Sequence, residues 1–204
     1  MTQAATTTTT RRTLLLTAAA LVALPLAGCD KIKPTAFNGI DLTGASYATD
    51  FRLTDPEGRE RTLADFKGQA VMLFFGFTQC PDVCPTALAR AAEVKQLLGK
   101  DGDRLQVIFV TIDPERDTPQ LLKAYTAAFD PSFLGLRGDI QRTAETAKDF
   151  KAFYKKVPTG SSYTMDHSAF SYIYDAQGRI RLAMRHEQTA QQYADDLRQI
   201  LNPH

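Results

Sequence analysis

The fold of this chain is decided by Val71-Met-Leu-Phe-Phe-Gly-Phe77 and the segment that follows it, Thr78-Gln-Cys-Pro-Asp-Val-Cys-Pro85. Residues 71 to 77 form an unbroken apolar run, which is typical of a strand buried on both faces of a sheet. Apolar side chains then recur at helical spacing, at positions 88, 91, 94 and 98. A buried strand, a short loop and a helix therefore follow one another, and this is a unit from which α/β folds are built.

Outside this unit, strand-like and helix-like segments alternate along the chain without internal repeats. We expect further strands at residues 46–54, 59–63, 105–112, 133–136, 169–174 and 179–185, and further helices at 121–129, 140–154 and 190–201. The turn Asp55-Pro-Glu-Gly58 predicts that the first two of these strands form a hairpin. We expect residues 159–166 to form a flexible polar loop. The order of elements predicts an α/β, thioredoxin-like fold: a central mixed β-sheet flanked by helices, with an N-terminal β-hairpin extension.

The composition is that of one globular domain with a sizeable core. Of the 204 residues, 44% are hydrophobic and 23% are charged. The 24 basic residues nearly cancel the 23 acidic ones, whereas a protein whose chief partner is nucleic acid usually carries a basic excess. We therefore expect no nucleic-acid partner.

The first 28 residues have the pattern of an export signal. Arg11 and Arg12 precede an apolar run at residues 13–24, which is too short to span the ~30 Å core of a bilayer. Leu26-Ala-Gly-Cys29 looks like a bacterial lipobox, in which the cysteine receives the lipid. The two arginines also resemble a twin-arginine signal, and general secretory export remains the alternative.

This pattern predicts three regions. Residues 1–28 would be the export signal, residues 29–45 the lipidated Cys29 with a flexible tether, and residues 46–204 the folded domain. Asp30 resembles the signal that retains lipoproteins on the inner membrane. We therefore expect a lipoprotein of the bacterial inner (cytoplasmic) membrane that faces the periplasm, bound to the membrane through its lipid anchor.

Cys80 and Cys84 are the two thiols that remain once Cys29 is lipidated. They lie on the loop after a buried strand, at the end of the sheet where α/β folds place their ligands. Pro85 suits the first turn of a helix, whose unpaired N–H groups and positive dipole favour thiolate. The pair is therefore suited to metal binding or disulfide exchange. An inert structural disulfide is the alternative, although the five-residue loop it would close offers little entropic stabilisation.

Three histidines could add a nitrogen ligand. His186 follows an edge strand and His204 ends the chain, where a surface role suffices for both. His167 directly precedes the strand expected at 169–174, which would neighbour the cysteine-bearing strand. Two thiolates and one imidazole would suit copper, as Cu(I) or Cu(II), better than a structural zinc site with four ligands.

No strong fourth ligand is evident near these three residues. Asp82 is better explained as a turn residue, Asp166 as a capping group or a partner of a ligand, and Met165 as a packing residue.

Three motifs, in order along the chain, resemble the Sco/SenC family of copper-binding proteins. They are Phe75-Gly-Phe-Thr-Gln-Cys-Pro-Asp-Val-Cys-Pro85, Thr111-Ile-Asp-Pro-Glu-Arg-Asp-Thr-Pro119, and Asp166-His-Ser168 followed by a strand and Asp175-Ala-Gln-Gly178. The resemblance implies a thioredoxin-like fold that binds one copper per chain through Cys80, Cys84 and His167. Cys80 and Cys84 would also be the redox pair that can form a Cys80–Cys84 disulfide.

The resemblance further implies a role in maturing the CuA centre of cytochrome c oxidase. The chain would be primarily a copper metallochaperone, a thiol-disulfide reductant, or both. Its partners would be the CuA-bearing oxidase subunit and an upstream copper donor. A general extracytoplasmic thiol-disulfide oxidoreductase of the thioredoxin-like type is the alternative. In the second motif, a turn and a helix start account for the pattern, and docking of a partner at Glu115 or Arg116 is a further hypothesis.

Overall fold

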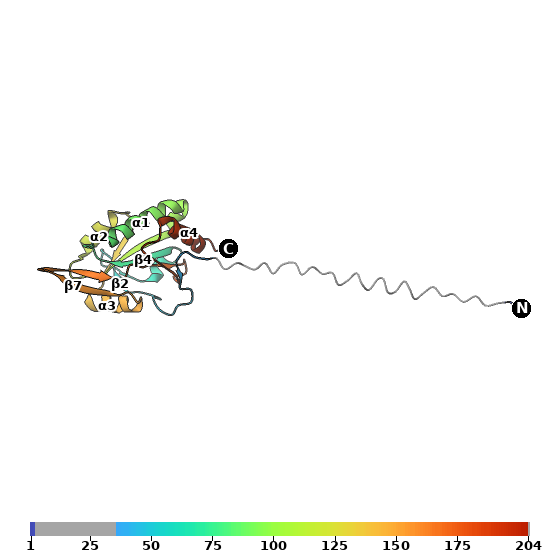
Figure 1. Ribbon diagram of the computed structural model, residues 1–204, viewed down its shortest axis with the longest axis horizontal. Helices are drawn as coiled ribbons and strands as arrows, with labels where there is room; N and C mark the ends of the chain where they lie inside the picture. The colour runs from blue at the N-terminus through green and yellow to red at the C-terminus, as the bar shows by residue number, and fades with distance from the viewer. Residues whose placement is uncertain (3–35, 204) are drawn as a thin grey trace. The chain divides into compact units, whose positions relative to one another are not determined.

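A six-stranded mixed sheet forms the centre of the computed structural model, which describes residues 1–2 and 36–203 (Figure 1). The strand order is β1-β10-β9-β4-β5-β6. The strands are β1 (Ile40–Asp41), β4 (Ala70–Gly76), β5 (Leu105–Thr111), β6 (Leu134–Leu136), β9 (Ser171–Tyr174) and β10 (Ile180–Met184). The pairs β4–β5 and β5–β6 are parallel, and β9 is antiparallel to both β4 and β10. The mixed sheet and the position of β9 beside β4 confirm the predicted topology.

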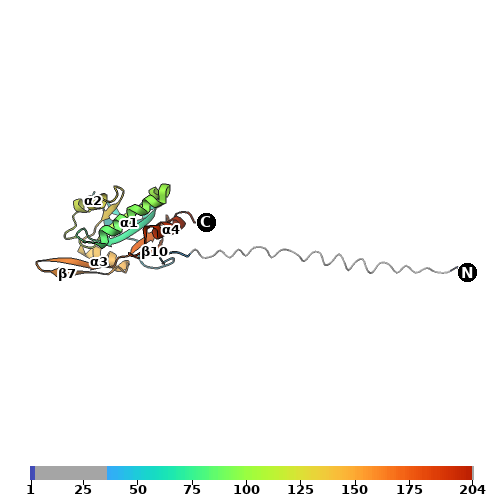
Figure 2. The same ribbon diagram turned by 45° about the horizontal axis from the view of Figure 1, so that its top comes forward.

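Helices cover both faces of this sheet. They are α1 (Val83–Leu98), α2 (Pro119–Ala127), α3 (Ile140–Asp149) and α4 (Ala190–Leu201), with short 3₁₀ helices η1 (Leu63–Phe66) and η2 (Gly99–Arg104). α1 and α4 pack against each other, and α3 lies on the opposite side of the sheet from them (Figures 1 and 2). At the C-cap of α3, Phe150 is fully buried and meets Phe75 of β4 edge to face at 5.1 Å between ring centres. This layering confirms the predicted thioredoxin-like fold.

The folded unit begins at Phe37, nine residues before the boundary expected at residue 46. β1 pairs with β10 at the edge of the sheet, and the buried carboxylate of Asp196 on α4 accepts the backbone N–H groups of Asn38 and Gly39. A two-residue strand carries no periodic pattern, and its partner strand β10 lies more than 140 positions along the chain. Local sequence reasoning therefore missed it.

The expected N-terminal hairpin is present but shorter than predicted, with β2 (Leu53–Thr54) paired to β3 (Glu60–Arg61). Its turn is organised by Asp55, whose buried carboxylate accepts hydrogen bonds from the side chains of Arg59 and Arg61. The turn of β9–β10 repeats the arrangement, with Asp175 accepting the side chain of Arg179. Both turns follow from the Asp-x-x-Gly-Arg pattern.

A second hairpin replaces the loop expected at residues 159–166 and shortens the helix expected at 140–154. α3 ends at Asp149, and β7 (Tyr154–Thr159) pairs with β8 (Ser162–His167) as a separate two-stranded ribbon that projects from the domain (Figure 2). Most of β7 is polar and exposed, so it lacks the apolar run that identifies a buried strand. In β8, however, Tyr163, Met165 and His167 alternate with more polar positions, which is a strand period.

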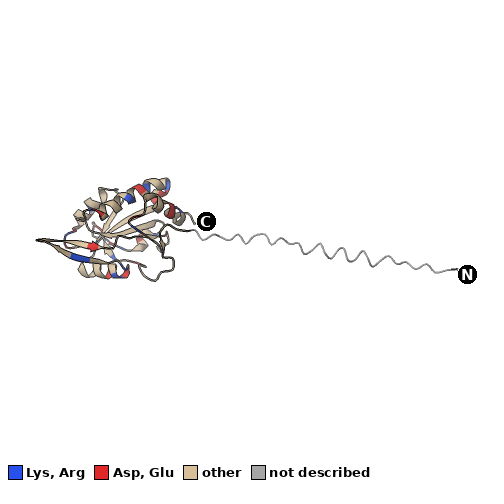
Figure 3. Cartoon of the chain, in the orientation of Figure 1, with Lys and Arg blue, Asp and Glu red and all other residues tan. Residues whose placement is uncertain are grey.

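Basic and acidic residues are interspersed along the helices instead of being segregated on them (Figure 3). Within the described residues, no helix combines the length and apolarity needed to cross a bilayer.

Candidate metal centre

The two cysteines occupy unequal positions on either side of the start of α1. Cys80 lies on the loop after β4 and is partly exposed, whereas Cys84 is the second residue of α1 and is fully buried. The backbone N–H of Cys84 donates to Cys80 Sγ at 3.4 Å, and both thiols are free. The N-terminus of α1 thus directs an N–H group at the more accessible sulfur, as expected from the position of Pro85.

This asymmetry separates the acidities of the two thiols. Hydrogen bonding from the Cys84 side chain, helped by backbone N–H groups, lowers the pKa of Cys80 to about 3. Burial raises the pKa of Cys84 well above its ordinary value, and the neighbouring Cys80 sulfur raises it further. Cys80 is therefore the thiolate of the metal-free pair, and Cys84 is the thiol that donates to it.

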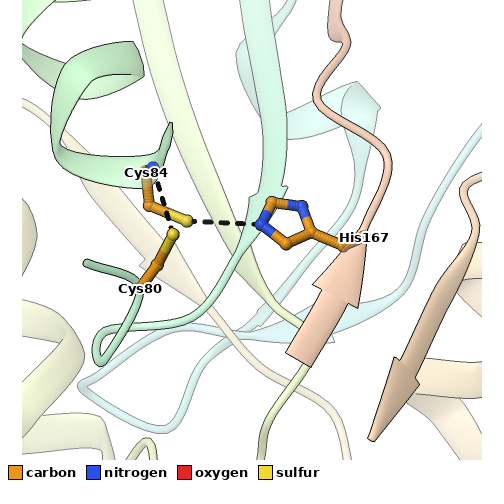
Figure 4. Close-up of side chains that lie close together, drawn as sticks. All are labelled: Cys80, Cys84 and His167. Carbon is orange, nitrogen blue, oxygen red and sulfur yellow. Dashed lines mark hydrogen bonds between the residues drawn. The ribbon is translucent and has the colours of Figure 1, made fainter. Parts of the chain in front are cut away.

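His167 completes the cluster from the end of β8 (Figure 4). Its Nδ1 lies 2.9 Å from the carbonyl oxygen of Ser168, which can only accept, so Nδ1 carries the proton. Nε2 is therefore left as a lone-pair donor, and it lies 3.6 Å from Cys84 Sγ. The rings of Phe74 and Phe77 meet the imidazole edge to face at 6.0 and 5.9 Å between centres, which restricts its orientation.

The three candidate ligand atoms lie within 4.8 Å of one another. Within the described residues, this is the only group of three or more Cys, His, Asp or Glu side chains with such spacing. The structure therefore brings together the three residues that the sequence singled out. The local structure of His167 differs from the expectation. We expected His167 to follow a flexible loop, whereas it is the last residue of strand β8.

Gly76, the last residue of β4, leaves the space that the buried sulfur of Cys84 occupies. A Cβ at this position would lie 2.7 Å from Cys84 Sγ and 2.7 Å from the ring of Phe109. Any side chain there would displace the sulfur or the ring, so the close packing requires glycine.

The other candidate residues lie outside the cluster. Asp82 is exposed at the N-cap of α1 and accepts a hydrogen bond from the Thr86 hydroxyl. Asp166 is exposed and Met165 is buried. His186 is not among the clustered ligand atoms. Cys29 and His204 lie outside the described residues.

Sequence reasoning missed the role of Asp117, a fully buried carboxylate behind the cysteine loop. It accepts the backbone N–H and the hydroxyl of Thr78, the latter at 2.6 Å, and the hydroxyl of Thr111 at 2.6 Å. It therefore ties the start of the cysteine loop to the end of β5. Burial raises the pKa of Asp117, while the hydroxyl donors act in the opposite direction. The only signal in the sequence was the Thr111–Pro119 motif, for which a turn and a helix start were a sufficient explanation.

The family profile described as SCO1/SenC matches residues 41–202. The chain belongs to the SCO1/SenC family. A SCO2-like protein of Rickettsia felis is 41% identical over 133 residues, which cover 64% of this chain and 65% of that protein. The match thus spans slightly less than two thirds of that relative.

Solved SCO1/SenC structures share the fold. The structure of Bradyrhizobium japonicum ScoI with copper bound superimposes with a TM-score of 0.68 at 42% sequence identity, covering 74% of this chain and 97% of that one. The apo Sco1 protein of Thermus thermophilus superimposes with a TM-score of 0.72 at 38% identity, covering 80% and 96% of the two chains. The family's fold therefore extends over the whole region that carries the cluster.

Proposed function

We propose that this SCO1/SenC protein binds one copper ion per chain through Cys80, Cys84 and His167 and serves in assembly of the CuA centre of cytochrome c oxidase. The observation that carries the proposal is the convergence of two sulfurs and one imidazole nitrogen within 4.8 Å. The copper-bound ScoI of Bradyrhizobium japonicum supports it. So does the description of a further relative as a member of the Sco family of cytochrome c oxidase assembly proteins.

The donor set fits copper as the transported ion. Two soft thiolates favour Cu(I), and the added imidazole lets the same site hold Cu(II). A structural zinc site closes with four ligands, and the described residues bring only these three together. A three-ligand site that is partly open at Cys80 and His167 leaves room for a partner's ligand to approach, which transfer requires.

The same pair supports disulfide reduction of the oxidase subunit as a second role. The Cys80 thiolate would attack a partner disulfide, forming a mixed disulfide and releasing one partner thiolate. Cys84, after losing its proton, would attack the Cys80 sulfur and release the second partner thiol. Two electrons pass to the partner, and the Cys80–Cys84 disulfide remains. The low pKa of Cys80 and its exposure favour it as the attacking sulfur.

A general extracytoplasmic thiol-disulfide oxidoreductase is the alternative function, favoured by the same low thiol pKa. The two proposed functions differ in whether they require His167. Exchange needs the two thiols alone, whereas Cu(II) binding needs the nitrogen ligand.

We further propose that residues 1–28 are an export signal and that Cys29 carries the lipid. The protein would then be anchored to the inner membrane and face the periplasm, where it would receive copper from an upstream donor. The proposed tether follows Cys29 within residues 29–45, and the part of this stretch from Phe37 onward belongs to the same compact unit as the domain. Confining the protein and a membrane-bound oxidase subunit to one surface raises their effective concentration for each other.

Anaerobic copper titration against competing chelators tests the ligand assignment. The reduced protein should bind one copper ion, and Cys80→Ser or Cys84→Ser should abolish tight binding. His167→Ala should weaken Cu(II) binding by more than the roughly 10–100-fold that accompanies loss of a group that only orients a ligand. Cu(I) affinity should fall much less, because two thiolates suffice. His186→Ala is the matched control and should change neither affinity. Unaltered Cu(II) affinity in His167→Ala would remove His167 from the site.

Deletion of the gene tests the cellular role. Loss of oxidase activity that added copper restores would support delivery, whereas restoration by an added thiol reductant would support disulfide reduction. Unchanged oxidase activity in the deletion strain would reject both roles.

A further inference from the structure

The hairpin that carries His167 is attached to the domain through the ring of Tyr163, four residues before the histidine on β8. The Tyr163 hydroxyl donates to Asp113 Oδ1 at 2.9 Å, and the guanidinium carbon of Arg116 lies 3.7 Å from the ring centre. Stacking of a guanidinium on an aromatic face is strongest where both groups are shielded from water. The Arg116 side chain is 17% exposed, so this contact is largely desolvated.

Arg116 also contacts the cysteine loop. Its Nη1 donates to Gln79 Oε1 at 3.0 Å and to the backbone carbonyl of Tyr163 at 2.8 Å. Its Nε pairs with the buried Asp113. One rigid guanidinium therefore joins three segments: the residue before Cys80, the turn after β5, and strand β8. A planar fork of fixed N–H directions can hold such a junction, whereas a lysine could not.

Strand geometry relates this junction to the metal ligand. Side chains two apart along a strand share one face, so Tyr163, Met165 and His167 face the same way. Met165 between them is buried. At the far end, Ser168 and Phe153 exchange hydrogen bonds, which close the base of the hairpin. Holding Tyr163 in place therefore restricts where His167 can lie.

A docking role for Arg116, one of the hypotheses from the sequence, does not fit this environment. Its Nε and Nη1 are turned inward to Asp113, Gln79 and Tyr163, and its Nη2 is buried. The exposed ion pair at this place is that of Glu115 with Lys156.

We propose that Arg116 is a positioning residue for the metal centre: it clamps the β7–β8 hairpin to the cysteine loop and thereby holds His167 Nε2 beside the two sulfurs. The expected effect of this clamp on copper affinity rests on the proposed copper-binding function. Because Cu(I) is held by the two thiolates and Cu(II) needs the imidazole, the clamp determines how well the site holds Cu(II) relative to Cu(I).

The test compares Arg116→Gln with the wild type and with Arg142→Gln, which removes an exposed arginine paired with Glu145 on α3. The first readout needs no metal: NMR contacts between the His167 ring and the rings of Phe74 and Phe77 in the reduced protein. Arg116→Gln should weaken or abolish them, and Arg142→Gln should leave them intact. The second readout is copper affinity. Arg116→Gln should lower Cu(II) affinity about 10–100-fold, the range for loss of a ligand-orienting partner, and leave Cu(I) affinity nearly unchanged.

Tyr163→Leu removes the other half of the clamp and provides a second variant should Arg116→Gln fail to fold. It should produce the same two changes, and combining the substitutions should add little, because each removes the stacking of the Arg116 guanidinium on the Tyr163 ring. Intact His167 contacts in the folded variant, or a loss of Cu(II) affinity with those contacts preserved, would overturn the proposal. If the wild type binds no copper, the proposed function fails, and the ring contacts still decide whether the clamp exists.

Discussion

Alkylation of Cys80 as a function of pH tests the electrostatic asymmetry of the dithiol. Only the thiolate reacts, so the rate follows the fraction of thiolate. With its ordinary pKa of 9.0, a thiol would react about 100-fold faster at pH 7 than at pH 5. With the pKa lowered to about 3, Cys80 is already almost fully ionised at pH 5. Its rate should therefore change by less than about twofold over this interval.

Two variants at the neighbouring position identify the cause. Cys84→Ser keeps a side-chain hydroxyl that can donate to Cys80, as well as the backbone N–H at 3.4 Å. Cys84→Ala keeps the backbone donor alone. The flat rate profile should persist in the serine variant, whereas the alanine variant should need a higher pH to reach its maximal rate, because the largest contribution to the lowered pKa is the Cys84 side chain.

The assay is iodoacetamide labelling under anaerobic, metal-free conditions, read by mass spectrometry of the Cys80 peptide so that Cys29 does not contribute. A rate that rises about tenfold per pH unit from pH 5 to pH 7 in the wild type would refute the assignment of Cys80 as the thiolate. Equal profiles for the serine and alanine variants would instead refute the Cys84 side chain as the main donor.

Three further predictions concern packing, docking of the N-terminal segment and redox coupling. Gly76→Ala should destabilise the fold by about 1–3 kcal/mol in urea unfolding, because its Cβ would meet Cys84 Sγ and the Phe109 ring at 2.7 Å; an unchanged midpoint would contradict this packing. Asp196→Ala should cost about 1–3 kcal/mol by leaving the part-buried N–H donors of Asn38 and Gly39 without their acceptor, and it should speed hydrogen exchange at Asn38; continued protection there would show that β1 holds without the carboxylate. Oxidation to the disulfide should prevent copper binding, since thiolates are the ligands; a disulfide form that still binds copper tightly by chelator competition would rule this out.

The cysteine loop was predictable because its determinants are local. An apolar run predicts β4, helical spacing predicts α1, and both cysteines lie between or within these two elements. The same local patterns predicted β5, α2 and the β9–β10 hairpin, each of which the structure contains. Their burial follows directly from their own side chains, so no distant partner is needed to recognise them.

The hairpin and the clamp were not predictable in the same way. β7 is polar on most of its length, and its pairing with β8 removes little apolar surface from water. Arg116 and Asp113 lie in a segment where a turn and a helix start already explained the residue types. Their contacts with Tyr163 join residues about 50 positions apart in the sequence. The spacing of apolar residues along a chain does not indicate a contact between such distant polar residues.

The amino-acid sequence alone determined that two thiols four positions apart flank a helix start, because a buried strand and an amphipathic helix place them there. Tertiary structure decided which of the two sulfurs is exposed and where the imidazole lies. The exposure of an atom depends on every segment packed around it, which no local pattern reports. Cys84 and His167 are 83 positions apart, and His167 reaches the sulfurs because it lies on a hairpin that Arg116 holds in place.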